Sequence, residues 1–338
     1  MEDRTFRRTV ERAYGKAQKK INKFRAKCLH PDCSLDAIDS HSQQKLGQLR
    51  AIAESGEVYG LQRNQYQMLK ALPSGPSLVR MGISEASTFK GYCSRHDKEI
   101  FQPIESRPLR QSDQEQAYIL FVRAFSYEFA QKRHMLEWHS LILGELKNIV
   151  GNDIRQYFEA TRDGIAAFFR HDVPYYMHQI FADLRSKNFS NITTVWKTVD
   201  HNVGISSCCV FSPLLGGHEE HMRNTWGIPQ PMVAFNVVPQ AAVTDVVASW
   251  FSDSAKYCGW ITEEVRTKDG FERFINLCAF AESEDTCVRP SLWESLSESE
   301  RKLAEIAIAP IHTRGPLVSM PSVVKFLIES FKRQFHAK

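Results

Sequence analysis

The chain has 338 residues, of which 43% are apolar and 21 are Phe, so it can bury a sizeable core and is not disordered as a whole. Its net charge of +4 is small, no apolar run reaches the roughly eighteen residues of a membrane span, and the N-terminus lacks the apolar centre of a secretory signal, so we expect a cytoplasmic protein without membrane contact. In that compartment the eight cysteines are expected to be thiols or metal ligands rather than disulfides.

The first segment, residues 1–27, combines an apolar stripe with strong basic charge. Apolar residues recur at steps of three and four, which predicts an amphipathic helix over residues 4–26: Phe6, Val10, Ala13, Ala17, Ile21 and Phe24. Residues 1–27 hold ten Lys or Arg against three Asp or Glu. This excess indicates nucleic acid as a partner of the basic helix 4–27, and a plain solvated face is the alternative.

The next segment carries two close pairs of metal-binding residues. Cys28 and Cys33 are separated by four residues, and Cys93 and His96 by two. Zinc takes four nitrogen or sulfur ligands, which are usually delivered as two close pairs on tight turns. Because the sequence between the pairs is weakly patterned, a metal could replace the core that it lacks. We therefore predict a zinc-binding module over residues 28–110 with these four residues as ligands.

Two further histidines leave the roles in this module open. His30 and His41 compete with the four predicted ligands for zinc. If zinc does not take His41, this residue lies beside the metal at the end of a short strand predicted over 36–40. A neutral imidazole in that position could act as a general base on water. Alternatively, Ser40 and His41 cap a helix predicted over 42–56.

Residues 111–200 have the pattern of a helical region. Ser112 and Glu115 have the spacing of a capping box, which predicts a helix start. A second helix follows, and Pro174 is expected to interrupt or kink it. Antiparallel packing of these helices is the predicted core of the middle of the chain.

The last segment, residues 201–338, changes to short apolar runs rich in β-branched residues. Three strands are predicted at 203–211, 231–239 and 244–251. Helices are predicted at 269–282, 297–308 and 322–335, the second of them with a capping box from Ser297 to Glu300. His218 and His221 fit a polar loop better than a metal site. The fold class is therefore α+β: a zinc-binding N-terminal module, a central helical segment and a C-terminal α+β domain with a short-stranded sheet.

The order of a cysteine pair, a histidine at a strand end and a closing Cys-x2-His resembles the zinc-stabilised HNH (treble-clef) nucleases. The resemblance implies a structural zinc on Cys28, Cys33, Cys93 and His96. It also implies that His41 activates water while a second ion, Mg²⁺ or Mn²⁺, holds the scissile phosphate. The sequence departs from the family because His41 and His96 are 55 residues apart, a longer separation than in the family's compact unit. It also lacks a clear Asn-His pair for the second ion, for which Asn64 and His96 are the nearest candidates.

Three ordered motifs resemble uncharacterised bacterial proteins more closely. They are C-x-H-P-x-C at Cys28–Cys33, AI-x-SH-x-x-Q at Ala37–Gln44 and F-x-G-[FY]-C-x-x-HD-x-x-[IL]-F at Phe89–Phe101. The resemblance implies a common fold and an association with phage defence, but no established activity. We therefore expect a zinc-binding module that contacts nucleic acid or a protein partner. The alternative is an HNH-like metal-dependent nuclease with His41 as general base.

Overall fold

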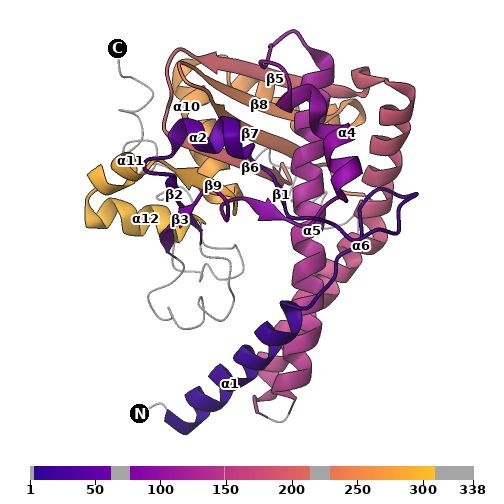
Figure 1. Ribbon diagram of the computed structural model, residues 1–338, viewed down its shortest axis with the longest axis vertical. Coiled ribbons are helices and arrows are strands. Elements are labelled where there is room, and N and C mark those ends of the chain that lie inside the picture. Colours follow the sequence, from indigo (N-terminus) through magenta and orange to yellow (C-terminus); the bar gives the residue numbers. More distant parts are fainter. Residues whose placement is uncertain (1–3, 62–76, 148, 214–228, 309–338) are drawn as a thin grey trace.

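The centre of the molecule is an antiparallel sheet covered by helices on both faces, as the computed structural model in Figure 1 shows. The structure describes residues 4–61, 77–147, 149–213 and 229–308. Within these ranges the sheet has seven strands. In spatial order they are β3 (Leu78–Gly82), β2 (Glu57–Leu61), β9 (Thr286–Val288), β6 (Ile205–Phe211), β7 (Val233–Pro239), β8 (Thr244–Phe251) and β5 (Ile192–Val199).

Helical segments account for most of the remaining described residues. Before the last strands they are α1 (Arg4–Ile21), η1 (Lys45–Leu49), α2 (Arg50–Ile52), α4 (Ser94–Glu105), α5 (Gln114–Leu146), α6 (Asn152–Ser186) and η2 (Phe189–Asn191). Those near the C-terminus are η4 (Ser252–Ser254), α8 (Ala255–Cys258), α9 (Trp260–Glu264), α10 (Lys268–Asn276), η5 (Leu277–Glu282), α11 (Pro290–Ser295) and α12 (Glu298–Ile308).

The two faces of the sheet belong to two different apolar cores. Val246 and Ala248 point into one core, which is completed by residues of α9, α10, η5, α11 and α12. Val247 points into the other core, which contains residues of α4, α5 and α6. Because both faces are covered, every residue of β6, β7 and β8 is buried. These strands therefore show no alternation of exposed polar and buried apolar residues, and even their polar residues, such as Asn236 and Asp245, are buried.

Helix α5 extends well beyond the sheet, and α1 packs against its distal half (Figure 1). Ala13, Ala17 and Ile21 form the buried stripe of α1. They join Trp138 and Ile142 of α5 in a small separate core. The small alanine side chains allow the two helices to approach closely. Lys16 and Lys20 of α1 add ion pairs with Glu145 at the edge of this contact.

A second, two-stranded sheet forms between the large sheet and α5. Its strands are β1 (Ser40–His41) and β4 (Thr88–Phe89), which pair antiparallel. Directly after β1, the hydroxyl of Ser42 donates to Asp285, and the side-chain amide of Gln43 donates to the carbonyl of Asp285. All three of these residues are buried. This polar contact attaches the small sheet to the segment that leads into β9.

The α+β fold class is confirmed, and several predicted elements are found with shifted ends. Helix α1 ends at Ile21, because Asn22 and Lys23 form a turn. The predicted capping box from Ser112 is wrong: the side chain of Asp113 is the cap and accepts from the Gln116 backbone at 3.1 Å. The capping box from Ser297 to Glu300 is confirmed, with both reciprocal hydrogen bonds present.

Other differences concern strands that the sequence did not reveal. The segment 57–82 of the predicted module contributes β2 and β3 to the large sheet, and β5 and β9 were not predicted either.

Helix α6 runs through Pro174 without interruption. The helix predicted at 322–335, the loop with His218 and His221, and Asn64 lie outside the described residues.

The contact between α1 and α5 predicts a measurable loss of stability in Ile142→Ala. Ile142 is fully buried between the helices, and its truncation leaves a cavity. We expect a loss of about 2–5 kcal/mol in the free energy of unfolding, measured by urea denaturation. The control Leu46→Ala removes a side chain that is 72% exposed and should change stability by less than about 0.5 kcal/mol. Equal effects of the two variants would contradict this packing.

Candidate metal centre

Two tight turns deliver the four predicted ligands. Residues 27–36, called the knuckle below, form a loop closed by a bridge between Lys27 and Asp36 and carry Cys28 and Cys33. The second turn is the start of α4, where Cys93 is the N-cap. His96 lies in the first turn of the same helix, so the Cys-x2-His spacing places both side chains at one end of α4.

Backbone hydrogen bonds hold the knuckle against the segment that precedes α4. The N–H of Leu29 donates to Gly91, and the N–H of Ile38 donates to Tyr92, both at 2.8 Å. Arg133 of α5 donates to two backbone carbonyls, those of Lys27 and Lys90, also at 2.8 Å. The two turns are therefore fixed relative to each other and to α5.

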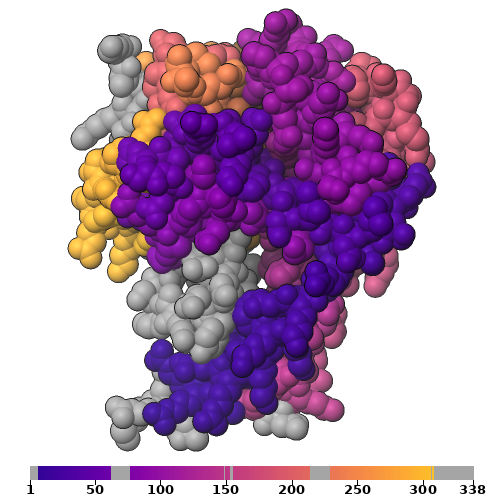
Figure 2. All heavy atoms as spheres, viewed as in Figure 1, coloured from indigo at the N-terminus to yellow at the C-terminus, as the bar shows by residue number. Residues whose placement is uncertain are grey.

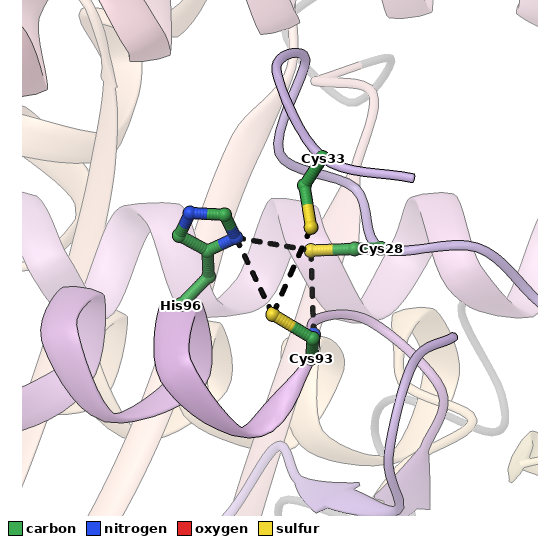
Figure 3. Close-up of side chains that lie close together, drawn as sticks. All are labelled: Cys28, Cys33, Cys93 and His96. Carbon is green, nitrogen blue, oxygen red and sulfur yellow. Dashed lines mark hydrogen bonds between the residues drawn. The ribbon is translucent and has the colours of Figure 1, made fainter. Parts of the chain in front are cut away.

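The four side chains point toward one another, as Figure 3 shows. One ligand atom from each of Cys28, Cys33, Cys93 and His96 lies within 4.8 Å of all the others. His96 Nδ1 is 3.4 Å from the sulfur of Cys28 and 3.5 Å from that of Cys93. The sulfurs of Cys33 and Cys93 are 3.8 Å apart. In the part of the chain that the structure describes, no other group of three or more potential ligands has this geometry.

The electrostatics of the cluster differ from one thiol to the next. Burial raises the pKa of the Cys28 thiol to about 11. The Cys93 thiol at the start of α4 has a lowered pKa, because it accepts a hydrogen bond from the backbone N–H of His96. Burial lowers the pKa of His96, which keeps the imidazole neutral and its lone pair available. A divalent cation would supply the positive charge that lets all three thiols ionise together.

His30 and Arg95 surround His96 but do not belong to the cluster. The rings of His30 and His96 stack with their centroids 3.9 Å apart. Phe181 of α6 contacts the ring of His30 edgewise. Arg95 Nη2 lies 2.8 Å from His96 Nε2. Ligation through Nδ1 leaves the proton of a neutral imidazole on Nε2. We therefore expect the exposed Arg95 side chain to turn away when a metal binds.

The donor set fits a structural metal site. Three thiols and one imidazole are soft and borderline ligands, of the kind that zinc prefers in closed tetrahedral sites. Cys28, Cys93 and His96 are buried, and Cys33 is partly buried. The backbone N–H of Cys93 also donates to the Cys28 sulfur at 3.3 Å, which favours a thiolate. The cluster can therefore hold one metal ion.

His41 lies outside this cluster, at the end of β1. Its ring is partly buried, and its Nε2 has no hydrogen-bond partner among the described residues. Burial lowers its pKa, which hydrogen bonding to the backbone at Ile83 partly opposes. Neither His41 nor His30 replaces a ligand in the group of four. Of the two residues considered for a second ion, His96 lies in the cluster and Asn64 lies outside the described residues.

Two polar residues near His41 were not selected from the sequence. Asp97, next to His96 on α4, has a buried carboxylate oxygen with no partner among the described residues. Burial raises the pKa of Asp97, and a hydrogen bond with Ser40 and the charges of Arg123 and His41 lower it in part. Arg123 of α5 is only 1% exposed. In the sequence, Asp97 could have been noticed because it directly follows His96. Arg123 could have been noticed because it is the single charged residue in the apolar run Ile119–Phe125.

Comparisons with known proteins give no further information on this arrangement. No family model matches the chain, and neither a curated protein nor a solved structure matches it. Among the helices of the described residues, none is long and apolar enough to cross a membrane.

The geometry of the cluster predicts different metal contents for serine variants of two buried cysteines. Cys28→Ser should lose about one equivalent of zinc per chain, measured by elemental analysis of the purified protein. Cys258→Ser replaces a fully buried thiol outside the cluster and should keep the metal. Limited proteolysis of Cys28→Ser should show new cuts in the knuckle, because loss of the metal leaves only hydrogen bonds and packing to hold it against α4. Retention of zinc by Cys28→Ser would contradict the ligand assignment.

Proposed function

We propose that this protein is a zinc-binding protein whose N-terminal part contacts nucleic acid. The observation that carries the proposal is the convergence of three cysteines and one histidine from two turns. The knuckle, the paired strands β1 and β4, and α4 follow the order of a treble-clef module. In such a module zinc has a structural role, since four protein ligands leave no position for a substrate.

The exposed face of α1 supports nucleic acid as the partner. Arg8, Arg12 and Lys19 are exposed and lie on one stripe of the helix by its 3.6-residue period, away from the buried alanines. Figure 2 shows the atoms of α1 on the molecular surface, at the end distant from the sheet. Phosphate contacts made by such residues release counterions, which gives affinity without sequence specificity. A phosphate backbone can also displace the exposed ion pairs of Lys16 and Lys20, because such pairs are weak.

This proposal predicts a change in the salt dependence of DNA binding. Replacing Arg8, Arg12 and Lys19 by Gln should weaken binding of duplex DNA, measured by fluorescence anisotropy at several salt concentrations. The slope of log K against log salt should fall by about 2.7 if all three contact phosphates. The matched control replaces three exposed lysines elsewhere, Lys197, Lys256 and Lys268, and changes the net charge equally. Identical slopes for the two triple variants would exclude α1 as the contact surface.

A metal-dependent nuclease is the second candidate function. The observation that favours it is the unpartnered Nε2 of His41, near the unpartnered carboxylate oxygen of Asp97. His41 would act as the general base, and its lowered pKa keeps the ring neutral for that role. Mg²⁺ or Mn²⁺ would be required at the phosphate. Because His41 Nε2 is shielded from solvent, this function also requires the site to open for a substrate.

The nuclease candidate predicts that His41→Ala lowers the rate of DNA cleavage by about 10²–10⁴. The assay incubates plasmid and single-stranded DNA with the zinc-loaded protein and Mg²⁺ or Mn²⁺. His178→Ala removes an exposed histidine of α6 and should leave the rate unchanged. If the wild-type protein retards DNA without cutting it, or if His41→Ala cuts normally, the nuclease candidate is rejected and the zinc-binding role stands.

A further inference from the structure

A pocket of about 380 Å³ lies where the end of α4, η1, α5 and the end of β7 meet. Its walls include apolar side chains such as Leu46, Ile104, Leu120 and Val238. Leu46 is 72% exposed and contributes apolar surface to the pocket lining. The volume is at the lower end of the range for small-molecule sites, so the pocket suits a ligand with about one ring.

Arg123 lines this pocket and is incompletely paired. Its side chain is 2% exposed, and its guanidinium carbon lies 4.3 Å from the centroid of the Phe101 ring. One nitrogen, Nη2, donates to the carboxylate of Glu105. Within the described ranges, Nε and Nη1 have no hydrogen-bond partner. A guanidinium cannot lose its charge in a protein, so burying two unsatisfied donors is costly unless a ligand uses the group.

Glu105 accepts only from Nη2 of Arg123, whereas an external oxyanion in its place could bond Nη2 and a second guanidinium nitrogen together. Glu105 is the last residue of α4, it lines the same pocket, and its side chain is 37% exposed. A partly exposed carboxylate on a buried arginine can be displaced by the carboxylate or phosphate of a ligand, since both anions match the guanidinium geometry. The displaced Glu105 side chain would turn into water at little cost.

The remaining charges of the pocket also favour an anion. Arg50 is exposed at the pocket, and Arg107 contributes a third positive charge. Arg107 is already paired with Asp113 and Glu115. The pocket lining has three arginines and one glutamate, and with Arg107 neutralised by Asp113 and Glu115 the positive charge of the lining comes mainly from Arg50 and Arg123.

We propose that this pocket binds a small organic anion, with an oxyanion group on Arg123 in place of Glu105 and an apolar body against Leu46, Ile104 and Leu120. The shared chemistry is a carboxylate or a phosphate monoester attached to a ring-sized apolar group. The site is separate from the four metal ligands and from the basic stripe of α1. It therefore does not depend on the zinc-binding and nucleic-acid roles proposed above, whereas Arg123 does lie near Asp97 and His41 of the nuclease candidate.

The first experiment uses isothermal titration calorimetry on the full zinc-loaded chain with three ring compounds of similar shape. Benzoate carries a carboxylate, phenyl phosphate a phosphate monoester, and benzamide neither. At least one of the two anions should bind at least tenfold more tightly than benzamide, and the tighter one identifies the preferred oxyanion. Equal binding of all three compounds, or no binding of either anion, overturns the proposal.

Variants of pocket residues then test whether the anion binds in this pocket. Glu105→Gln removes the competing carboxylate and should raise the affinity for the preferred anion about tenfold, whereas Arg123→Gln should lower it at least tenfold. Arg107→Gln is the matched control within the pocket wall and should change the affinity less than about twofold, because its partners are Asp113 and Glu115. Weaker anion binding by Glu105→Gln would contradict the proposal that the anion displaces Glu105 from Arg123.

Arg123 is buried, so its replacement could disturb folding, and a further variant covers that case. Ala241 is exposed and lines the pocket near β7. Ala241→Trp should fill the pocket and abolish binding while zinc content and the urea midpoint stay unchanged. Normal binding by Ala241→Trp would show that the anion binds elsewhere and would overturn the proposal.

Discussion

Three sulfurs and an imidazole nitrogen lie within 4.8 Å of one another, and a shared cation is what makes such a cluster favourable. The contributing turns are about sixty residues apart in the chain, so their junction closes a long loop at an entropic cost. Packing and hydrogen bonds offset part of that cost: Cys28 and Cys93 belong to the core shared with α5 and α6, and Arg133 donates to the backbone on both sides. The metal centre is thus built into the main core.

The sequence revealed the long and fully buried elements and missed the short or edge ones. Strands β6, β7 and β8 are short segments rich in apolar and β-branched residues, and α5 carries a long apolar stripe, so their patterns identify them. Strand β9 has only three residues and β2 contains a glycine, which leaves too little pattern to recognise. Strand β5 is an edge strand with Thr and Lys among its apolar residues, and it directly follows a helix. These strands depend on pairing partners that are distant in the chain.

The cluster of three cysteines and one histidine could be predicted because each half of it is local. A Cys-x4-Cys loop and a Cys-x2-His helix start bring their side chains together through short-range geometry alone. The pocket at Arg123 has no such local signature. Arg123 and Glu105 lie on different helices, and η1 and β7 come from distant parts of the sequence. Only the assembled fold brings these residues to one place, so spacing along the chain could not indicate it.

Helix α5 is long enough to take part in two separate cores. Its 33 residues span about 50 Å at the usual helical rise. One half packs beside the metal ligands, and the other half holds α1. The same helix therefore supports both the Cys-His cluster and the basic stripe of α1. Lys19 of the stripe and Cys28 of the cluster are nine residues apart in the chain, a reach of about 32 Å at most, so a duplex of on the order of 10 base pairs is long enough to touch both.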